Sequence, residues 1–230
     1  MCIRDRLERE PHPEVYALKV EALKVLEEMS EQGLVDLYYG DESRISLEPC
    51  VPYAWQFKDQ EVFMPSTQGK GLNCFALLWR ANECRFETTQ KSIDARFIVE
   101  QLESVEQLES VEQLESVSLE ALRLERVTVV VLDSAPAHVA KLVVAKLVVA
   151  KLVKEHRKFW PERGLFVFYL PSYSPHLNIA EVLWRKLKYQ WLRPQDYLDT
   201  QTLFYQVRQA LAAVGSLLKI HFAPFQHSLT

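Results

Sequence analysis

The sequence predicts an α/β fold in which a mixed sheet is flanked by helices. Val127–Leu132 is a fully apolar, largely β-branched run, typical of a buried central strand. Antiparallel strand signals precede this run, and helices alternate with strands after it. Because crossovers between parallel strands are right-handed, we expect this run to lie beside the first strand of the chain.

The first third of the chain predicts a helix and then strands. Val15–Gln32 has apolar residues at helical spacing, and Gly33 is well placed to end the helix. Leu34–Tyr39 is the first predicted strand. A turn at Gly40-Asp41 would return Arg44–Leu47 beside it. The spaced apolar residues of the helix are Leu18, Ala22, Val25 and Met29.

A hairpin and several alternating elements are predicted after these. The hairpin pairs Val62–Met64 with Leu72–Trp79 around the loop Pro65–Gly71. Arg85–Thr88 adds a short strand, and the chain turns helical from Ile93. The later elements are helices over Val139–Phe159, Ile179–Leu192 and Thr200–Val214, with a strand over Leu165–Leu170.

Composition narrows the class of protein. The net charge of -4 argues against nucleic-acid binding by bulk charge alone, but it is compatible with an acidic metal site. The four cysteines form no CxxC pair, which argues against structural zinc. Neither a signal peptide nor a membrane-spanning stretch is recognisable. We therefore expect a cytoplasmic protein with reduced thiols and no membrane partner.

Two short repeats interrupt the chain. VEQLES occurs three times within residues 99–117, and AKLVV occurs twice, followed by AKLV, within residues 140–153. Six residues advance a helix by about 240°, so the first repeat builds no single apolar stripe. One interpretation is a helical interaction arm. We favour the other, a tandem duplication or sequence-assembly fault inside two ordinary helices.

Three carboxylates suggest the chemistry. Asp41 follows the first predicted strand, Asp133 follows the Val127–Leu132 run, and Glu181 lies just inside a predicted helix. Hard divalent cations prefer such oxygen ligands, and pairs of these cations stabilise the attacking and leaving oxygens of a phosphodiester. The sequence therefore predicts a nucleic-acid strand-transfer enzyme. Glu42 would point away from Asp41 on an extended chain.

Three strings carry a family resemblance, namely LYYGDESRISLEPCVPYAW, VLDSAPAH and LPSYSPHLNIAEVLWRKLK. They resemble the catalytic core of mariner-like DDE transposases, of the bacterial insertion sequence 630 type. The resemblance runs from about Leu34 to about Leu192, and its third string is the most specific. Ser134 stands where the family commonly has Asn.

The resemblance implies a ribonuclease-H-like fold and a DD(E/D) triad that holds two Mg²⁺ or Mn²⁺ ions. Asp41, Asp133 and Glu181 match the first, second and third carboxylates. Between Asp133 and Glu181 lie 47 residues, and removing the ten duplicated ones leaves 37. That number is near the mid-thirties spacing usual in the family, which supports the duplication interpretation.

Further residues are candidates for orienting the triad or contacting DNA. His138 stands where the family often has a His, and Asn178 suits an N-cap of the Glu181 helix. The indole of Trp184 is expected in the core. Cationic candidates for DNA phosphates are Lys70, Arg185, Lys186 and Lys188, together with Arg193 near aromatic Tyr189 and Trp191.

The resemblance also organises the chain and its partners. Residues 1–33 are similar to the family's linker, 34–214 to its catalytic domain, and 215–230 form a tail. No helix-turn-helix region precedes Leu34, so we expect a truncated core. Expected partners are transposon-end and target DNA and a second copy of the chain. Two alternatives stay open: an inactive transposase remnant, and another ribonuclease-H-like nuclease.

Overall fold

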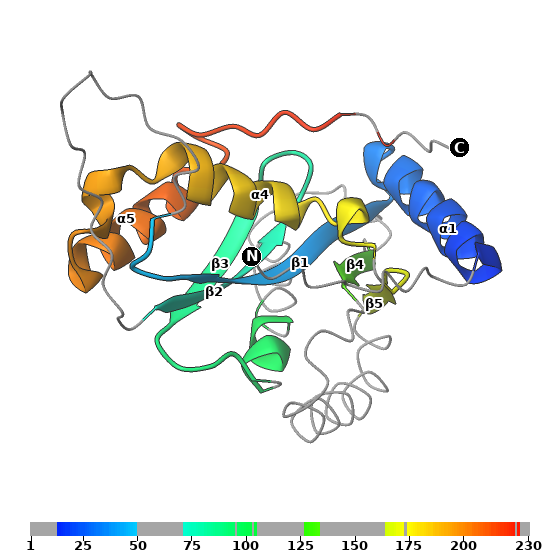
Figure 1. Ribbon diagram of the computed structural model, residues 1–230. Coiled ribbons are helices and arrows are strands. Elements are labelled where there is room, and N and C mark those ends of the chain that lie inside the picture. The colour runs from blue at the N-terminus through cyan, green and yellow to red at the C-terminus, as the bar shows by residue number, and fades with distance from the viewer. Residues whose placement is uncertain are drawn as a thin grey trace, which may run out of the picture.

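Five strands form one mixed sheet, in the order β3-β2-β1-β4-β5 (Figure 1). β1 pairs antiparallel with β2 and parallel with β4; β2 and β3 are antiparallel, and β4 and β5 are parallel. This order confirms the predicted ribonuclease-H-like mixed sheet, with β4 directly beside the first strand. The strands are β1 (Val35–Ile45), β2 (Leu72–Leu78), β3 (Cys84–Thr89), β4 (Val127–Leu132) and β5 (Leu165–Tyr169).

The computed structural model describes residues 13–49, 71–94, 96–102, 104, 127–133, 164–172, 174–223 and 225. Both repeats lie wholly or largely outside these residues, as do the predicted strand at Val62–Met64 and the predicted helix at Val139–Phe159. Within the described part of the chain, no helix is long and apolar enough to cross a membrane.

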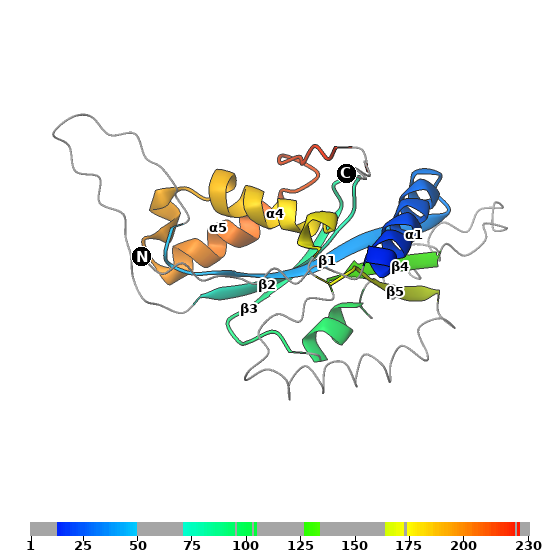
Figure 2. The ribbon, with the colours of Figure 1, turned by 45° about the vertical axis from the view of Figure 1, so that its right-hand side comes forward.

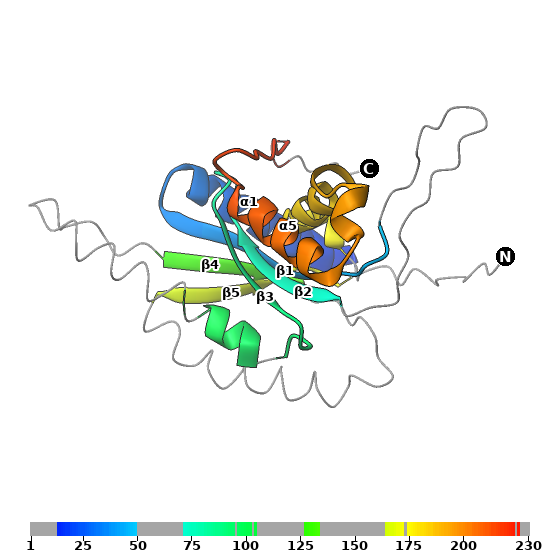
Figure 3. The same ribbon diagram turned by 90° about the vertical axis from the view of Figure 1, so that its left-hand side faces the viewer.

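Helices cover both faces of the sheet. Figures 1 and 2 show α1, α4 and α5 on one face, and Figure 3 shows the short helix at residues 96–102 on the opposite face. α4 continues directly into the π-helical turn η3. The helical elements are α1 (Pro13–Glu31), η2 (Pro175–Leu177), α4 (Ala180–Lys186), η3 (Leu187–Trp191), η4 (Pro194–Tyr197) and α5 (Thr200–Ala212).

Alternation along the strands divides the core into two layers. Successive side chains of a strand point to opposite faces. In β1, Leu37 and Tyr39 therefore join the layer under α1, α4 and α5, whereas Tyr38 joins the layer that holds Val99 and Leu102. Residues of β1 with odd numbers thus face α4, and this parity decides where the functional side chains point.

The predicted turn at Gly40-Asp41 is wrong. β1 runs without interruption from Val35 to Ile45, so Arg44–Leu47 does not return beside Leu34–Tyr39. Gly40 serves close packing instead. A Cβ at this position would lie 2.6 Å from Leu132 Cδ2 and 3.0 Å from Leu77 Cδ2. The glycine therefore accommodates neighbours on both adjoining strands.

α1 buries a different face from the one that its apolar spacing indicated. Val20, Leu23 and Glu27 are the buried residues of this helix, while Leu18 is 73% exposed and Val25 is 46% exposed. A charged residue, Glu27, thus takes a core-facing position that an apolar pattern does not reveal.

The buried Glu27 is held by Tyr39 of β1 and by Arg80, which lies in the turn after β2. Arg80 Nε lies 2.7 Å from both carboxylate oxygens of Glu27, and the Tyr39 hydroxyl donates to Glu27 Oε1. Burial and the Glu27 charge raise the pKa of Tyr39, so its hydroxyl stays protonated as a donor. This Glu27–Arg80–Tyr39 cluster ties α1 to the strand that carries Asp41.

Candidate active site

Asp41 and Asp133 lie at adjacent points of the sheet. Gly40 of β1 pairs with Leu132 of β4 in parallel register, and each aspartate is the next residue of its chain segment. Side chains two residues apart on an extended chain point to the same face. Asp41 therefore points to the same face as Tyr39, and Asp133 to the same face as Val131. Tyr39 and Val131 both pack in the layer under α4. The two carboxylates are therefore directed toward the face that α4 covers.

Glu181 occupies the first turn of α4 on that face. Its backbone N–H donates to the Asn178 carbonyl at 3.2 Å, and its side chain is exposed. The position in the first helical turn matches the prediction. A carboxylate there also interacts favourably with the positive end of the helix dipole.

The negative charges of neighbouring carboxylates affect the pKa values of Asp41 and Glu181. Burial, followed by the charge of Glu181, raises the pKa of Asp41 from 3.8 to about 7; a backbone hydrogen bond from Glu42 lowers this pKa, and the charges of Glu42 and Asp133 raise it to a smaller extent. Burial and the charge of Asp133 raise the pKa of Glu181, and the charge of Lys188 lowers it. Like charges gathered in a partly desolvated place disfavour ionisation. A bound cation would relieve that repulsion.

Glu42 does not belong to this group of side chains. Its side chain is exposed, and the alternation of β1 directs it to the face opposite Asp41. This is the arrangement expected for an extended chain.

Trp184 contacts Asp41 directly. The indole is 3% exposed, which confirms its predicted place in the core, and its Nε1 donates a hydrogen bond to Asp41 Oδ2 at 3.0 Å. This contact was not predicted from the sequence. A signal was present, because Trp184 stands three residues after Glu181 and thus on the same side of the helix.

Asn178 connects the start of α4 to β1. Its side-chain amide donates to the Gly40 carbonyl at 3.1 Å, and its Oδ1 accepts from Ala180 N–H at 3.1 Å. The expected capping interaction is present, although the N-cap itself is Ile179. Asn178 therefore satisfies a free N–H of the first turn and a strand carbonyl together.

A groove of about 430 Å³ runs along α4 beside Glu181. Arg185 is exposed on its rim, and Lys188 is half-buried. Lys186 donates to Gln190 instead, at 2.9 Å, and does not line the groove. The lining residues are Pro175, His176, Asn178, Glu181, Val182, Trp184, Arg185, Lys188 and Tyr189.

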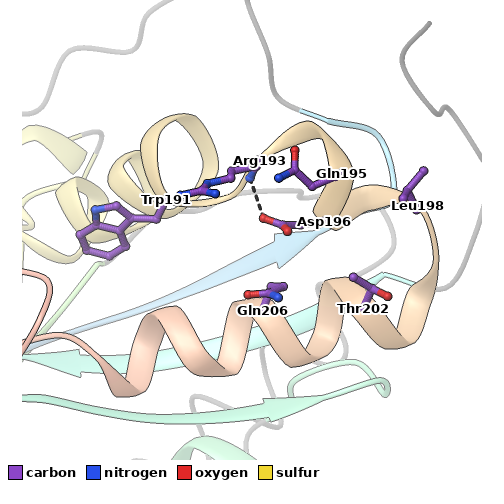
Figure 4. Close-up of a pocket in the computed structure, with 7 residues that line it drawn as sticks. All are labelled: Trp191, Arg193, Gln195, Asp196, Leu198, Thr202 and Gln206. Atoms are coloured by element: carbon purple, nitrogen blue, oxygen red, sulfur yellow. Dashed lines mark hydrogen bonds between the residues drawn. The ribbon is translucent and has the colours of Figure 1, made fainter.

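A second cavity, of about 610 Å³, lies at the junction of η3, η4 and α5 (Figure 4). None of the three carboxylates lines it. Figure 4 shows the hydrogen bond from Arg193 N to Asp196 Oδ2, which measures 2.7 Å and closes one side of the cavity. The larger cavity is thus separate from the carboxylate cluster.

Some of the predicted residues are not placed. His138, Ser134 and Lys70 lie outside the described residues. Among the residues that are described, no three His, Cys, Asp or Glu side chains are close enough together to form a ready metal site. The charges of Asp41, Asp133 and Glu181 interact, but their side chains do not lie close enough together to bind one cation as they stand.

Distant structural likeness is found to the transposase Mos1. The crystal structure of the Mos1 strand transfer complex has a TM-score of 0.45 and 14% identity, with 89% of this chain and 56% of that chain covered. The mariner Mos1 paired end complex with Mg gives 0.44 and 14%, with 90% and 60% covered. The Mos1 catalytic domain with Raltegravir and Mn gives 0.34 and 14%, with 87% and 96% covered.

The chain spans between 56% and 62% of the Mos1 chains in the strand transfer and paired-end structures. No curated protein matches it. A family match covers well over half of the chain. Residues 36–203, which include Asp41, Asp133 and Glu181, match the family described as DDE superfamily endonuclease. The chain therefore belongs to the DDE superfamily endonucleases.

Proposed function

We propose that this chain is the catalytic core of a DNA transposase of the mariner-like, insertion sequence 630 type, which cleaves DNA and joins the cut strand to a target. The observation that supports this most is the placement of Asp41 and Asp133 at adjacent points of β1 and β4, with Glu181 on the helix that packs on β1, within the region that matches the endonuclease family.

The donor chemistry fits divalent cations. All three side chains supply hard oxygen donors, which suit Mg²⁺ and Mn²⁺. Burial first, and then their mutual repulsion, raises the pKa values of Asp41 and Glu181, and bound cations offset repulsion of this kind. We propose that Asp41, Asp133 and Glu181 hold two such ions. When bound, these would stabilise charge on the attacking and leaving oxygens of a phosphodiester.

Other residues of this chain would position the DNA. Arg185 and Lys188 line the groove beside Glu181, where cationic side chains can contact backbone phosphates without reading sequence. Water attack on phosphorus would break the P–O3′ bond and leave a 3′ hydroxyl and a 5′ phosphate. Attack of that hydroxyl on a phosphodiester of the target would form a new P–O3′ bond, break the existing one and release a 3′ hydroxyl on the target strand. Phosphoryl transfer of this kind relies on positioning and charge stabilisation rather than on a covalent enzyme intermediate.

The proposed partners are transposon-end DNA, target DNA and a second copy of the chain. Mos1, to which the chain is similar, has been crystallised as a paired end complex and as a strand transfer complex. For location, we propose the cytoplasm. Cys74 and Cys84, which form no disulfide in the described part of the chain, support this.

Metal-dependent nicking of supercoiled plasmid tests the function. The chain should nick DNA with Mg²⁺ or Mn²⁺ and not with EDTA, and Asp133→Asn or Glu181→Gln should abolish nicking. Glu42→Gln is the matched control, because it removes a neighbouring carboxylate from the opposite face of β1. A folded chain that never nicks would support the remnant interpretation.

A strand-transfer assay distinguishes a transposase core from another ribonuclease-H-like nuclease. An oligonucleotide with a free 3′ hydroxyl should become joined to plasmid DNA in the presence of the wild-type chain. Nicking without joining would indicate another ribonuclease-H-like nuclease.

A further inference from the structure

Two side chains from the α4 region bind consecutive residues of β1. Asn178 donates to the carbonyl of Gly40 at 3.1 Å, and Trp184 donates to the side chain of Asp41 at 3.0 Å. Asn178 is 2% exposed and Trp184 is 3% exposed. The bond to Gly40 is buried and the bond to Asp41 is part-buried, and hydrogen bonds with little access to water hold geometry more firmly than those at the surface.

The Trp184 bond limits the freedom of the Asp41 carboxylate. An indole has one donor in a fixed direction and no acceptor, and the Trp184 ring packs in the core layer under α4. A donor fixed in this way holds Oδ2 in one place, and the carboxylate cannot rotate without losing the bond. A backbone hydrogen bond from Glu42 also holds the Asp41 carboxylate.

The Asn178 bonds fix the helix that carries Glu181. Its side chain joins Gly40 to Ala180, and its backbone carbonyl accepts from the N–H of Glu181 at 3.2 Å. The first turn of α4 is therefore tied to the residue that directly precedes Asp41. Movement of the first turn of α4 away from Gly40 has to break the Asn178 bond to Gly40.

We propose that Trp184 and Asn178 are positioning residues of the carboxylate site: Trp184 orients Asp41, and Asn178 sets the distance from β1 to the turn that carries Glu181. The proposal rests on the proposed function, since it assigns to both residues a role in cation binding. Outer partners that orient the ligands of a metal commonly change its affinity about 10- to 100-fold when they are removed.

Binding of Mn²⁺ to the chain without DNA is the test, with free Mn²⁺ followed by electron paramagnetic resonance. Trp184→Phe keeps an aromatic ring in the core but removes the N–H donor together with one ring of the indole, and it should weaken Mn²⁺ binding at least about 10-fold. Trp191→Phe is the matched control, since its half-buried ring lies on the same helical segment, and it should bind within about twofold of wild type. Equal affinity of both variants would overturn the proposal.

Asp41→Asn separates this proposal from the proposed function. If Asp41→Asn leaves Mn²⁺ affinity unchanged, the carboxylate site itself is refuted. If Asp41→Asn weakens binding and Trp184→Phe does not, only the positioning role fails. Asn178→Ser, which removes the donor to Gly40 and leaves the indole intact, should also weaken binding about 10-fold.

A measurement on the wild-type chain keeps the test decisive if Trp184→Phe does not fold. The chain has five tryptophans, and each gives an indole N–H signal in a ¹⁵N-resolved NMR spectrum. Titration with diamagnetic Mg²⁺ should move the indole signal of Trp184 well beyond those of Trp79 and Trp191, because among these three described indoles Trp184 is the one that donates to a proposed cation ligand. A titration in which no indole signal moves would contradict the role of Trp184.

Discussion

Gly40 of β1 lies opposite Leu132 of β4, and each residue directly precedes a carboxylate of the candidate site. The pairing sets the register that brings Asp41 and Asp133 together. It also brings the Leu132 side chain over the space that a Cβ of Gly40 would occupy, with Cδ2 at 2.6 Å from that position. A side chain at residue 40 would displace Leu132, which directly precedes Asp133, so the glycine helps to keep the two aspartates in place.

Gly40→Ala should destabilise the chain and impair cleavage together. The added methyl group must displace Leu132 and Leu77, whose flexible ends can move, so we expect a loss of roughly 1–2 kcal/mol in the free energy of unfolding. Displacement of Leu132 should also shift Asp133 and lower the nicking rate. Chemical denaturation and the plasmid assay measure the two effects.

A double variant is the control for this prediction. Leu132→Val removes the Cδ2 atom that the new methyl group would meet, so Gly40→Ala combined with Leu132→Val should lose less stability than the two single variants added together. Strict additivity would mean that the contact between residues 40 and 132 is not the source of the cost.

Asp41→Asn should stabilise the chain at pH 8 in the presence of EDTA. The pKa of Asp41 is raised from 3.8 to about 7 in the fold, so its contribution to stability is complete below pH 3.8 and is lost as the pH rises through about 7. At pH 8 the wild-type chain carries an ionised, partly desolvated carboxylate near Glu181. Its removal should raise the free energy of unfolding by on the order of 2 kcal/mol.

The same comparison in Mn²⁺ should reverse. A ligand that binds only the folded chain adds stability according to its concentration relative to its Kd, and only the wild-type chain retains the full set of carboxylates. Thermal unfolding in EDTA and in Mn²⁺, at pH 8 and at pH 5, measures both effects. If Asp41→Asn is less stable than wild type in EDTA at pH 8, the raised pKa of Asp41 is wrong.

Cleavage at subsaturating Mn²⁺ should decline as the pH falls through about 7. Protonation of Asp41, whose pKa is raised to about 7 by burial and by Glu181, removes a cation donor. Saturating Mn²⁺ should move the decline to lower pH, because the cation competes with the proton. Initial nicking rates between pH 5.5 and pH 8.5 at two Mn²⁺ concentrations are the measurement. A decline that stays at the same pH at both concentrations would contradict the assignment.

Strands and the aspartates that follow them could be predicted because both leave a signal within a few consecutive residues of the sequence. The apolar, β-branched run at Val127–Leu132 becomes β4, and Arg85–Thr88 falls within β3. Asp41 and Asp133 each follow such a run by one or two residues. Chain handedness then suffices to bring the two strands side by side.

The errors have a different physical origin. Gly40 resembles a turn glycine in sequence, but its role comes from the side chains of Leu132 and Leu77 on neighbouring strands. The hydrogen bond from Trp184 to Asp41 likewise joins residues far apart in the chain. Such contacts exist only after the sheet and α4 are assembled, so no local pattern contains them.

The Glu27–Arg80–Tyr39 cluster makes α1 part of the unit that holds Asp41. Arg80 Nε lies 2.7 Å from Glu27, whose side chain is 5% exposed, and Arg80 also donates to the carbonyl of Ala223 at 3.0 Å. Removing one partner of a buried ion pair leaves an uncompensated charge. Arg80→Met should therefore cost about 3 kcal/mol in the free energy of unfolding.

Lys24→Met is the matched control for Arg80→Met. Lys24 and Glu28 form a 4.0 Å pair on the same helix, with side chains 46% and 57% exposed, and exposed pairs of this kind contribute at most about 0.5 kcal/mol. Denaturation followed by far-UV circular dichroism should show one transition for wild type, shifted strongly by Arg80→Met and hardly by Lys24→Met. If α1 were an independent linker, Arg80→Met would instead leave the main transition in place, because the sheet would unfold without reference to Glu27.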